Sequence, residues 1–134
     1  MKLRIRGESL RFRLTQSEVA SLHEQGCCQE SVTLGVEGVP RLAYRVETSE
    51  GNEPGLRFTS GSDTVVTVLL PREQVAAWAG TDGEVGIYFT TAWATKVAIE
   101  KDFRCLDEAR DEDESDNFVN PNAGTSLHGE CRVQ

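Results

Sequence analysis

Five basic side chains alternate with apolar residues near the start of the chain. They are Lys2, Arg4, Arg6, Arg11 and Arg13. If this stretch forms a β-hairpin, the alternation places all five on one face of it. Like charges that lie opposite each other on a sheet destabilise it unless an anion or carboxylates lie between them. The sequence therefore predicts a face that binds an anionic small molecule or a protein partner without catalysis.

A later stretch contains two carboxylates that would suit such a face. Glu100 and Asp102 alternate with Val97, Ile99 and Phe103, so a strand there would present the acids opposite to its apolar side. We expect Glu100 and Asp102 to lie beside Arg4, Arg6, Arg11 and Arg13. The alternative is a solvated basic face with scattered ion pairs that contribute little.

Soft metal ligands gather in the last quarter of the chain. His128 and Cys131 have the close spacing that one turn needs to present two ligands to zinc, and Cys105 is the next candidate, with Cys27 or Cys28 as a fourth ligand. Only one proper pair is present. The competing interpretation is that the cysteines behave as small apolar residues, and we expect no resident cofactor.

A third possibility is a phosphate-binding tunnel enzyme. If the sheet closed into an open barrel, its interior could be lined by Arg4, Arg6, Arg11, Arg13, Arg41, Arg45, Glu47, Glu100 and Asp102. The chain has no E-x-E-x-K strand near its start, no G-x-S-x-G motif and no phosphate-cradling glycine loop. We therefore expect a protein without enzymatic activity.

The charge is distributed unevenly along the 134 residues, whose formal net charge is −8. Residues 100–134 carry 10 acidic and 4 basic side chains, whereas residues 1–99 are close to balanced. We expect residues 107–134 to form a poorly ordered acidic tail that competes for the basic face or adds a second contact. Nucleic acid and anionic membranes are unsuitable partners for so acidic a chain. Because no export signal is visible, we expect a cytoplasmic protein with reduced cysteines.

Local patterns predict the elements that position these residues. The alternation at 2–14, broken by Gly-Glu-Ser at 7–9, predicts the hairpin, and the capping box Thr-Gln-Ser-Glu at 15–18 begins a helix that Gly26 ends. Further strands are expected at 30–36, 41–48, 55–60, 84–90 and 95–103. We predict an α+β domain over residues 1–106, a mainly antiparallel sheet or open barrel with two short helices.

Two segments resemble each other. "LRFRLTQSEVASL" (10–22) aligns without gaps with "VTVLLPREQVAAW" (66–78), and both read as a strand that runs directly into a short helix. The match suggests a pseudo-twofold duplication of a strand-helix-strand-strand unit. The alternative is that any two such units look alike.

The segments "MKLRIRGESLRFRLTQSEV" and "VAIEKDFRCL" together resemble a family of small uncharacterised bacterial proteins. Its members share this opening, MKLRIRG-x-SLR-x-RLT-x-SEV, and the IEKDF-x-CL segment. The resemblance covers most of the chain and implies a bacterial cytoplasmic protein. It implies no activity, because none is established for that family.

Overall fold

The computed structural model describes residues 1–38, 40–103 and 118. Residues Met1–Asp102 form one compact unit, and every described helix and strand lies within it. The second unit, Phe103–Gln134, is described only at Phe103 and Phe118.

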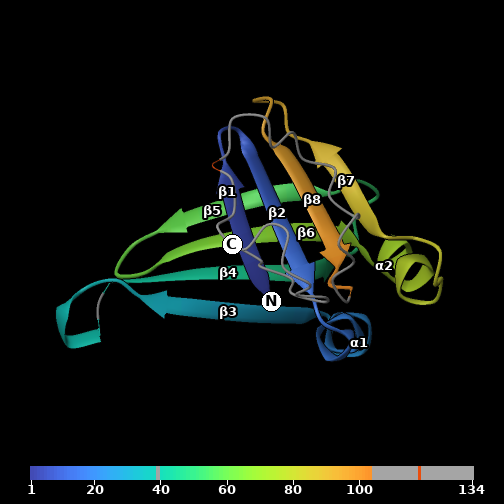
Figure 1. The fold of residues 1–134 in the computed structure, drawn as a ribbon, viewed down its shortest axis with the longest axis horizontal. Helices are drawn as coiled ribbons and strands as arrows, with labels where there is room; N and C mark the ends of the chain where they lie inside the picture. The colour runs from blue at the N-terminus through green and yellow to red at the C-terminus, as the bar shows by residue number, and fades with distance from the viewer. Residues whose placement is uncertain (39, 104–117, 119–134) are drawn as a thin grey trace. The chain divides into compact units, whose positions relative to one another are not determined.

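Eight strands of the first unit form two four-stranded sheets, whose strands cross in Figure 1. Sheet A consists, in spatial order, of β1 (Lys2–Arg6), β2 (Ser9–Leu14), β8 (Lys96–Lys101) and β7 (Gly86–Thr90). Sheet B consists of β3 (Cys27–Thr33), β4 (Arg41–Ser49), β6 (Thr64–Pro71) and β5 (Gly55–Ser60). In each sheet the two central strands are parallel, and each edge strand is antiparallel to its neighbour.

Two helices lie at the same end of the unit (Figure 1). Helix α1 (Gln16–Gln25) begins at the predicted capping box, in which the Thr15 side chain accepts from the Glu18 N–H and the Glu18 carboxylate accepts from the Thr15 N–H at 2.9 Å. It ends at Gly26, whose φ of 88° is a left-handed conformation that glycine adopts without strain. Helix α2 (Arg72–Ala79) follows β6 directly, and a short 3-10 turn spans Val36–Gly38. Neither described helix is long and apolar enough to cross a membrane.

The core lies between the inner faces of the two sheets and the two helices. Because strand side chains alternate between faces, the inner faces are apolar and the charged residues of β2, β4 and β8 lie outside. The buried core side chains are Phe12, Leu14, Val19, Leu22, Val46, Val68, Leu70, Val75, Trp78, Ile87, Val97 and Ile99. Trp78 also lies under Lys101, whose Nζ is 5.6 Å from the ring centroid.

The α+β class and the two short helices are confirmed, whereas the described strands do not form the single mainly antiparallel sheet or open barrel that was expected. After α1 the chain enters sheet B instead of pairing again with β2, so the strands form two separate mixed sheets. The alternation of apolar residues predicts where a strand lies but not which strand it pairs with. The division into two sheets could therefore not be predicted from the sequence. The strand expected at 30–36 spans Cys27–Thr33, because its pairing with β4 begins at Cys27 opposite Glu47, directly after α1 ends.

The order of elements occurs twice. The first half runs β1-β2-α1-β3-β4 and the second β5-β6-α2-β7-β8, each with an edge and a central strand in one sheet followed by an edge and a central strand in the other. Four of the residue pairs aligned in the sequence are buried in both members: Phe12 with Val68, Leu14 with Leu70, Val19 with Val75, and Leu22 with Trp78. The repeated order is compatible with a duplication, which stays a prediction.

Candidate functional site

The predicted arginine residues lie together on the outer face of sheet A. The register of β1 with β2 sets Lys2 opposite Arg13, Arg4 opposite Arg11 and Arg6 opposite Ser9. Directly opposite residues share a face of the sheet. The side chains between them on β2, Phe12 and Leu14, are buried in the core, so the basic side chains point away from it.

The parallel pairing of β2 with β8 completes this face. It sets Glu100 beside Arg13 and Lys96 beside Ser9. We define the basic face by eight charged residues: Lys2, Arg4, Arg6, Arg11, Arg13, Lys96, Glu100 and Asp102. Six of these eight described side chains are cationic, although the whole chain has a formal net charge of −8.

Both carboxylates expected beside the arginines form ion pairs there. Glu100 Oε1 lies 3.2 Å from Arg11 Nε and 3.9 Å from Arg13 Nε, and Asp102 Oδ2 lies 3.1 Å from Lys2 Nζ. The Tyr88 hydroxyl of β7 donates to the other Glu100 oxygen at 2.7 Å. The Glu100 side chain is only 14% exposed. It is therefore a structural counter-charge that holds two arginines side by side.

Two cations of the basic face have a different environment. Within the described part of the chain, neither Arg6 nor Lys96 has a carboxylate partner. Both are exposed. Arg6 ends β1 and Lys96 begins β8, and these strand ends lie at the end of sheet A that is remote from the helices (Figure 1). The positive charge available for an anion therefore lies at Arg6 and Lys96, because the two carboxylates of this face already pair with other cations.

The sequence reasoning missed Lys96 and Tyr88. Lys96 has the same alternation as Glu100 and Asp102, so its place on this face was readable once the strand was assumed. The place of Tyr88 on this face could not be predicted from the sequence, because its position opposite Ala98 depends on the register of β7 with β8. That register is set by the turn between these strands and not by a pattern within either of them.

The other arginines of the tunnel hypothesis lie on the outer face of sheet B. Arg45 Nε donates to Glu47 at 2.8 Å, and an Arg57 Nη donates to the other Glu47 oxygen at 2.7 Å. Arg41 pairs with Asp63 at 3.3 Å. The arginines of both sheets therefore face outward over an apolar interior, and the described residues form no tunnel. The condition of the tunnel hypothesis, a sheet closed into a barrel, is not met by the described strands.

Two carboxylates should make stability depend on pH. The hydrogen bond from Arg45 holds the pKa of Glu47 below its ordinary 4.5, against burial, which raises it, and Arg57 lowers it further. Burial raises the pKa of Glu18, but hydrogen bonds from the Met1 ammonium and from Thr15 outweigh that effect and lower it overall. A carboxyl with a lowered folded-state pKa stabilises the fold above its unfolded pKa and loses this effect as the pH falls through the folded value.

We therefore expect the free energy of unfolding to decrease as the pH falls below about 4.5. Glu47→Gln should lower it at neutral pH by about 1 kcal/mol, since the pair is partly exposed. The same variant should also lose less stability than the wild type on acidification. Urea denaturation at neutral pH and at about pH 3 tests both effects. Parallel pH curves for the two proteins would contradict the role given to Glu47.

The candidate zinc ligands Cys105, His128 and Cys131 lie outside the described residues, as does the acidic tail expected at 107–134 except for Phe118. Cys27 and Cys28 are free, and as neighbours in β3 they point to opposite faces. Burial, reinforced by the charge of Glu18, raises the pKa of Cys28 to about 11, which keeps it a protonated thiol and a poor metal ligand at neutral pH. Within the described part of the chain, no three potential ligands form a group that could hold a metal ion.

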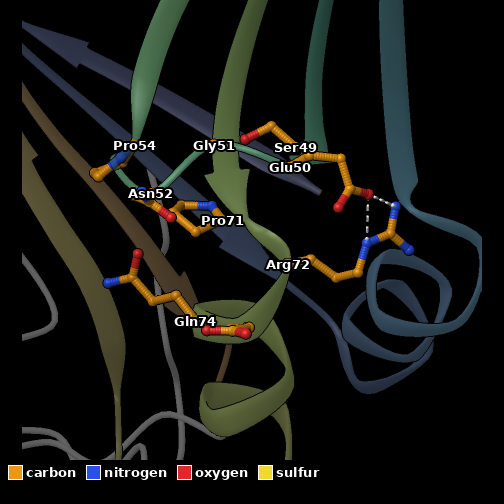
Figure 2. Close-up of a pocket in the computed structure, with 9 residues that line it drawn as sticks. Ser49, Glu50, Gly51, Asn52, Pro54, Pro71, Arg72 and Gln74 are labelled. Carbon is orange, nitrogen blue, oxygen red and sulfur yellow. Dashed lines mark hydrogen bonds and ion pairs between the residues drawn. The ribbon is translucent and has the colours of Figure 1, made fainter.

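A polar hollow of about 480 Å³ lies between the β4–β5 loop and the start of α2 (Figure 2). Its only cationic lining residue is Arg72, which binds Glu50 through Nε at 3.0 Å and Nη2 at 2.8 Å. The cation of this hollow is therefore already neutralised. The basic face remains the stronger candidate for an anion.

Comparison with known proteins adds a family but no activity. A family described as "Family of unknown function (DUF7009)" matches residues 1–122, which include both strands of the basic hairpin and β8. No curated protein and no solved structure matches the chain significantly.

Proposed function

The chain belongs to the DUF7009 family of unknown function, and from that premise we propose that it is a non-catalytic binding protein whose basic face holds an anionic ligand or protein partner. The observation that supports this proposal most is the local excess of charge. Six cations and two carboxylates share the outer face of sheet A in a chain of net charge −8, and among the described residues Arg6 and Lys96 have no carboxylate partner. Keeping like charges adjacent costs stability, so the arrangement suits a function better than a purely structural role.

The chemistry of the face favours binding over catalysis. Four of its cations are arginines, whose guanidinium forks bind carboxylates and phosphates through paired hydrogen bonds. A nucleophile would need an adjacent general base. The described face offers only carboxylates that are already engaged, Glu100 with Arg11 and Arg13, and Asp102 with Lys2. The acidic stretch 107–116 has the charge of a competitor for such a face, which makes it the natural regulator of binding.

Arg6 and Lys96 provide a test that should leave the fold intact. Changing both to Gln removes two positive charges without orphaning a described carboxylate. We expect the affinity for polyphosphate to fall about fivefold at low salt, since each exposed charge contributes about 0.5 kcal/mol. For both proteins binding should weaken as salt shortens the Debye length below about 10 Å. Titration calorimetry at low and high salt measures these changes.

The matched control is Arg41→Gln with Arg72→Gln. It removes the same formal charge from exposed ion pairs with Asp63 and Glu50, away from the basic face. Polyphosphate affinity should change much less in this control than in the Arg6 and Lys96 variant. Equal losses in the two variants would mean that net charge alone drives binding, and no binding by the wild type would refute the proposal.

A further inference from the structure

The turn between β7 and β8, at the end of sheet A where Lys96 begins β8, exposes a tryptophan. The Trp93 side chain is 89% exposed, whereas Trp78 is fully buried. A single exposed apolar residue needs no explanation by itself. Trp93 differs because of the backbone that carries it and because of the residues beside it.

The backbone of this turn is tightly fixed. The Thr91 N–H donates to the Thr95 carbonyl and the Ala94 N–H to the Thr91 carbonyl, both at 2.9 Å. The Thr91 hydroxyl also accepts from the Thr95 N–H at 3.1 Å. Ala94 has a φ of 69°, a left-handed conformation that residues with a side chain seldom adopt and that is found preferentially at functional positions. The turn therefore holds Trp93 in water on an ordered frame.

The turn also lies beside the two basic-face cations that have no carboxylate partner within the described strands. The Lys96 N–H donates to the Glu8 carbonyl at 2.8 Å, and the Thr95 hydroxyl donates to the Glu8 carboxylate at 3.3 Å. These bonds join the β7–β8 turn to the β1–β2 turn, which follows Arg6 (Figure 1). Arg6, Lys96 and Trp93 therefore belong to one end of sheet A.

The residue types at this surface are those that dominate protein interfaces. Arginine, tyrosine and tryptophan are the side chains most enriched among residues that contribute strongly to binding energy. The basic face contains four arginines, and Tyr88, which is 59% exposed, stands in the same row of sheet A as Arg4 and Arg11. A small inorganic anion would use the arginines but would gain nothing from Trp93.

We infer, on the basis of the proposed function, that the ligand of the basic face is a protein partner. An acidic segment of this partner lies across the arginines, and an apolar side chain of the same segment packs on Trp93. An anionic lipid surface would also combine negative charge with an apolar layer. It suits this chain less well, because the formal net charge of −8 repels such a surface.

Binding of three probes separates the contribution of negative charge from the contribution of an apolar side chain. The probes are polyphosphate, a short glutamate-rich peptide that ends in Ser, and the same peptide ending in Phe. We expect the full-length protein to bind the Phe peptide about fivefold more tightly than the Ser peptide, an apolar contribution of about 1 kcal/mol. The Phe peptide should also shift Trp93 fluorescence to shorter wavelength, with the buried Trp78 as a constant background.

Substitution of Trp93 tests whether this side chain provides the apolar contribution to peptide affinity. Trp93→Ala should abolish the preference for Phe without changing polyphosphate affinity, and Trp93→Phe should keep most of the preference. Both variants should fold, since the side chain is 89% exposed. Far-UV circular dichroism checks this.

The outcomes distinguish this inference from the proposed function. Equal affinity of the wild type for both peptides, together with polyphosphate binding that depends on Arg6 and Lys96, overturns the inference and leaves the proposed function standing. Binding to phosphatidylserine vesicles that is tighter than peptide binding and is lost in Trp93→Ala replaces the protein partner by a lipid surface. Failure of all the anionic probes to bind refutes both.

Discussion

Replacing Phe12 by Ala is expected to lower the free energy of unfolding by about 3–5 kcal/mol. Phe12 is fully buried on β2, a central strand of sheet A, and its ring packs in the core that joins the sheets to the helices. Removing the ring deletes buried apolar surface and leaves a cavity that the neighbouring core side chains fill only in part. Because a domain of this size is stable by about 5–15 kcal/mol, the variant should lie near the limit of folding.

Phe58→Ala is the matched control for this substitution. Phe58 lies on β5, an edge strand of sheet B, and is 64% exposed. The same change of side chain should cost less than about 1 kcal/mol there. Urea denaturation of both variants gives the comparison. Similar losses at the two positions would show that Phe12 does not occupy the centre of the core.

Local patterns in the sequence were sufficient to predict most of the individual elements. The hairpin at 2–14 and the start of α1 were readable because each depends on residues within a few positions of one another: the alternation, the turn formers and the Thr15–Glu18 capping box. The end of α1 at Gly26 was readable for the same reason. The assembly of these elements into two sheets was not, because a strand's own alternation shows which side chains it buries and not which strand it pairs with.

The same distinction applies to the site. Glu100 and Asp102 were expected beside the arginines because their alternation with Val97 and Ile99 fixes the face on which they lie. The arginine residues were correctly expected to share a face. Whether that face lined a barrel or faced solvent depended on sheet closure, which local periodicity does not determine. Trp93 gave no signal in the sequence, since its significance comes from contacts between the turns at Glu8 and Thr95.

Glu100→Gln should destabilise the protein and at the same time tighten its binding of anions. The carboxylate of Glu100 lies between Arg11 and Arg13 and neutralises part of their charge, so that an added anion competes with it for the same guanidinium groups. Glutamine keeps an oxygen that can accept from the Tyr88 hydroxyl but removes the negative charge. We expect the free energy of unfolding to fall by about 1–2 kcal/mol, because two cations lose a largely buried counter-charge. Polyphosphate affinity at low salt should increase about tenfold, and this gain should shrink as salt screens the face.

Glu47→Gln is the control that separates these two effects, because Glu47 holds Arg45 and Arg57 on sheet B much as Glu100 holds Arg11 and Arg13 on sheet A. It makes the same change in formal charge and breaks a comparable pair of ionic contacts. If the anion binds the basic face of sheet A, Glu47→Gln should lose stability to a similar extent without the tenfold gain in affinity, as measured by urea denaturation and titration calorimetry on the same samples. Equal gains in polyphosphate affinity in both variants would show that binding depends on the total charge of the protein and not on the basic face. A loss of affinity in Glu100→Gln would mean that the bound anion needs the two arginines held as Glu100 holds them, and that Glu100 positions the site instead of competing for it.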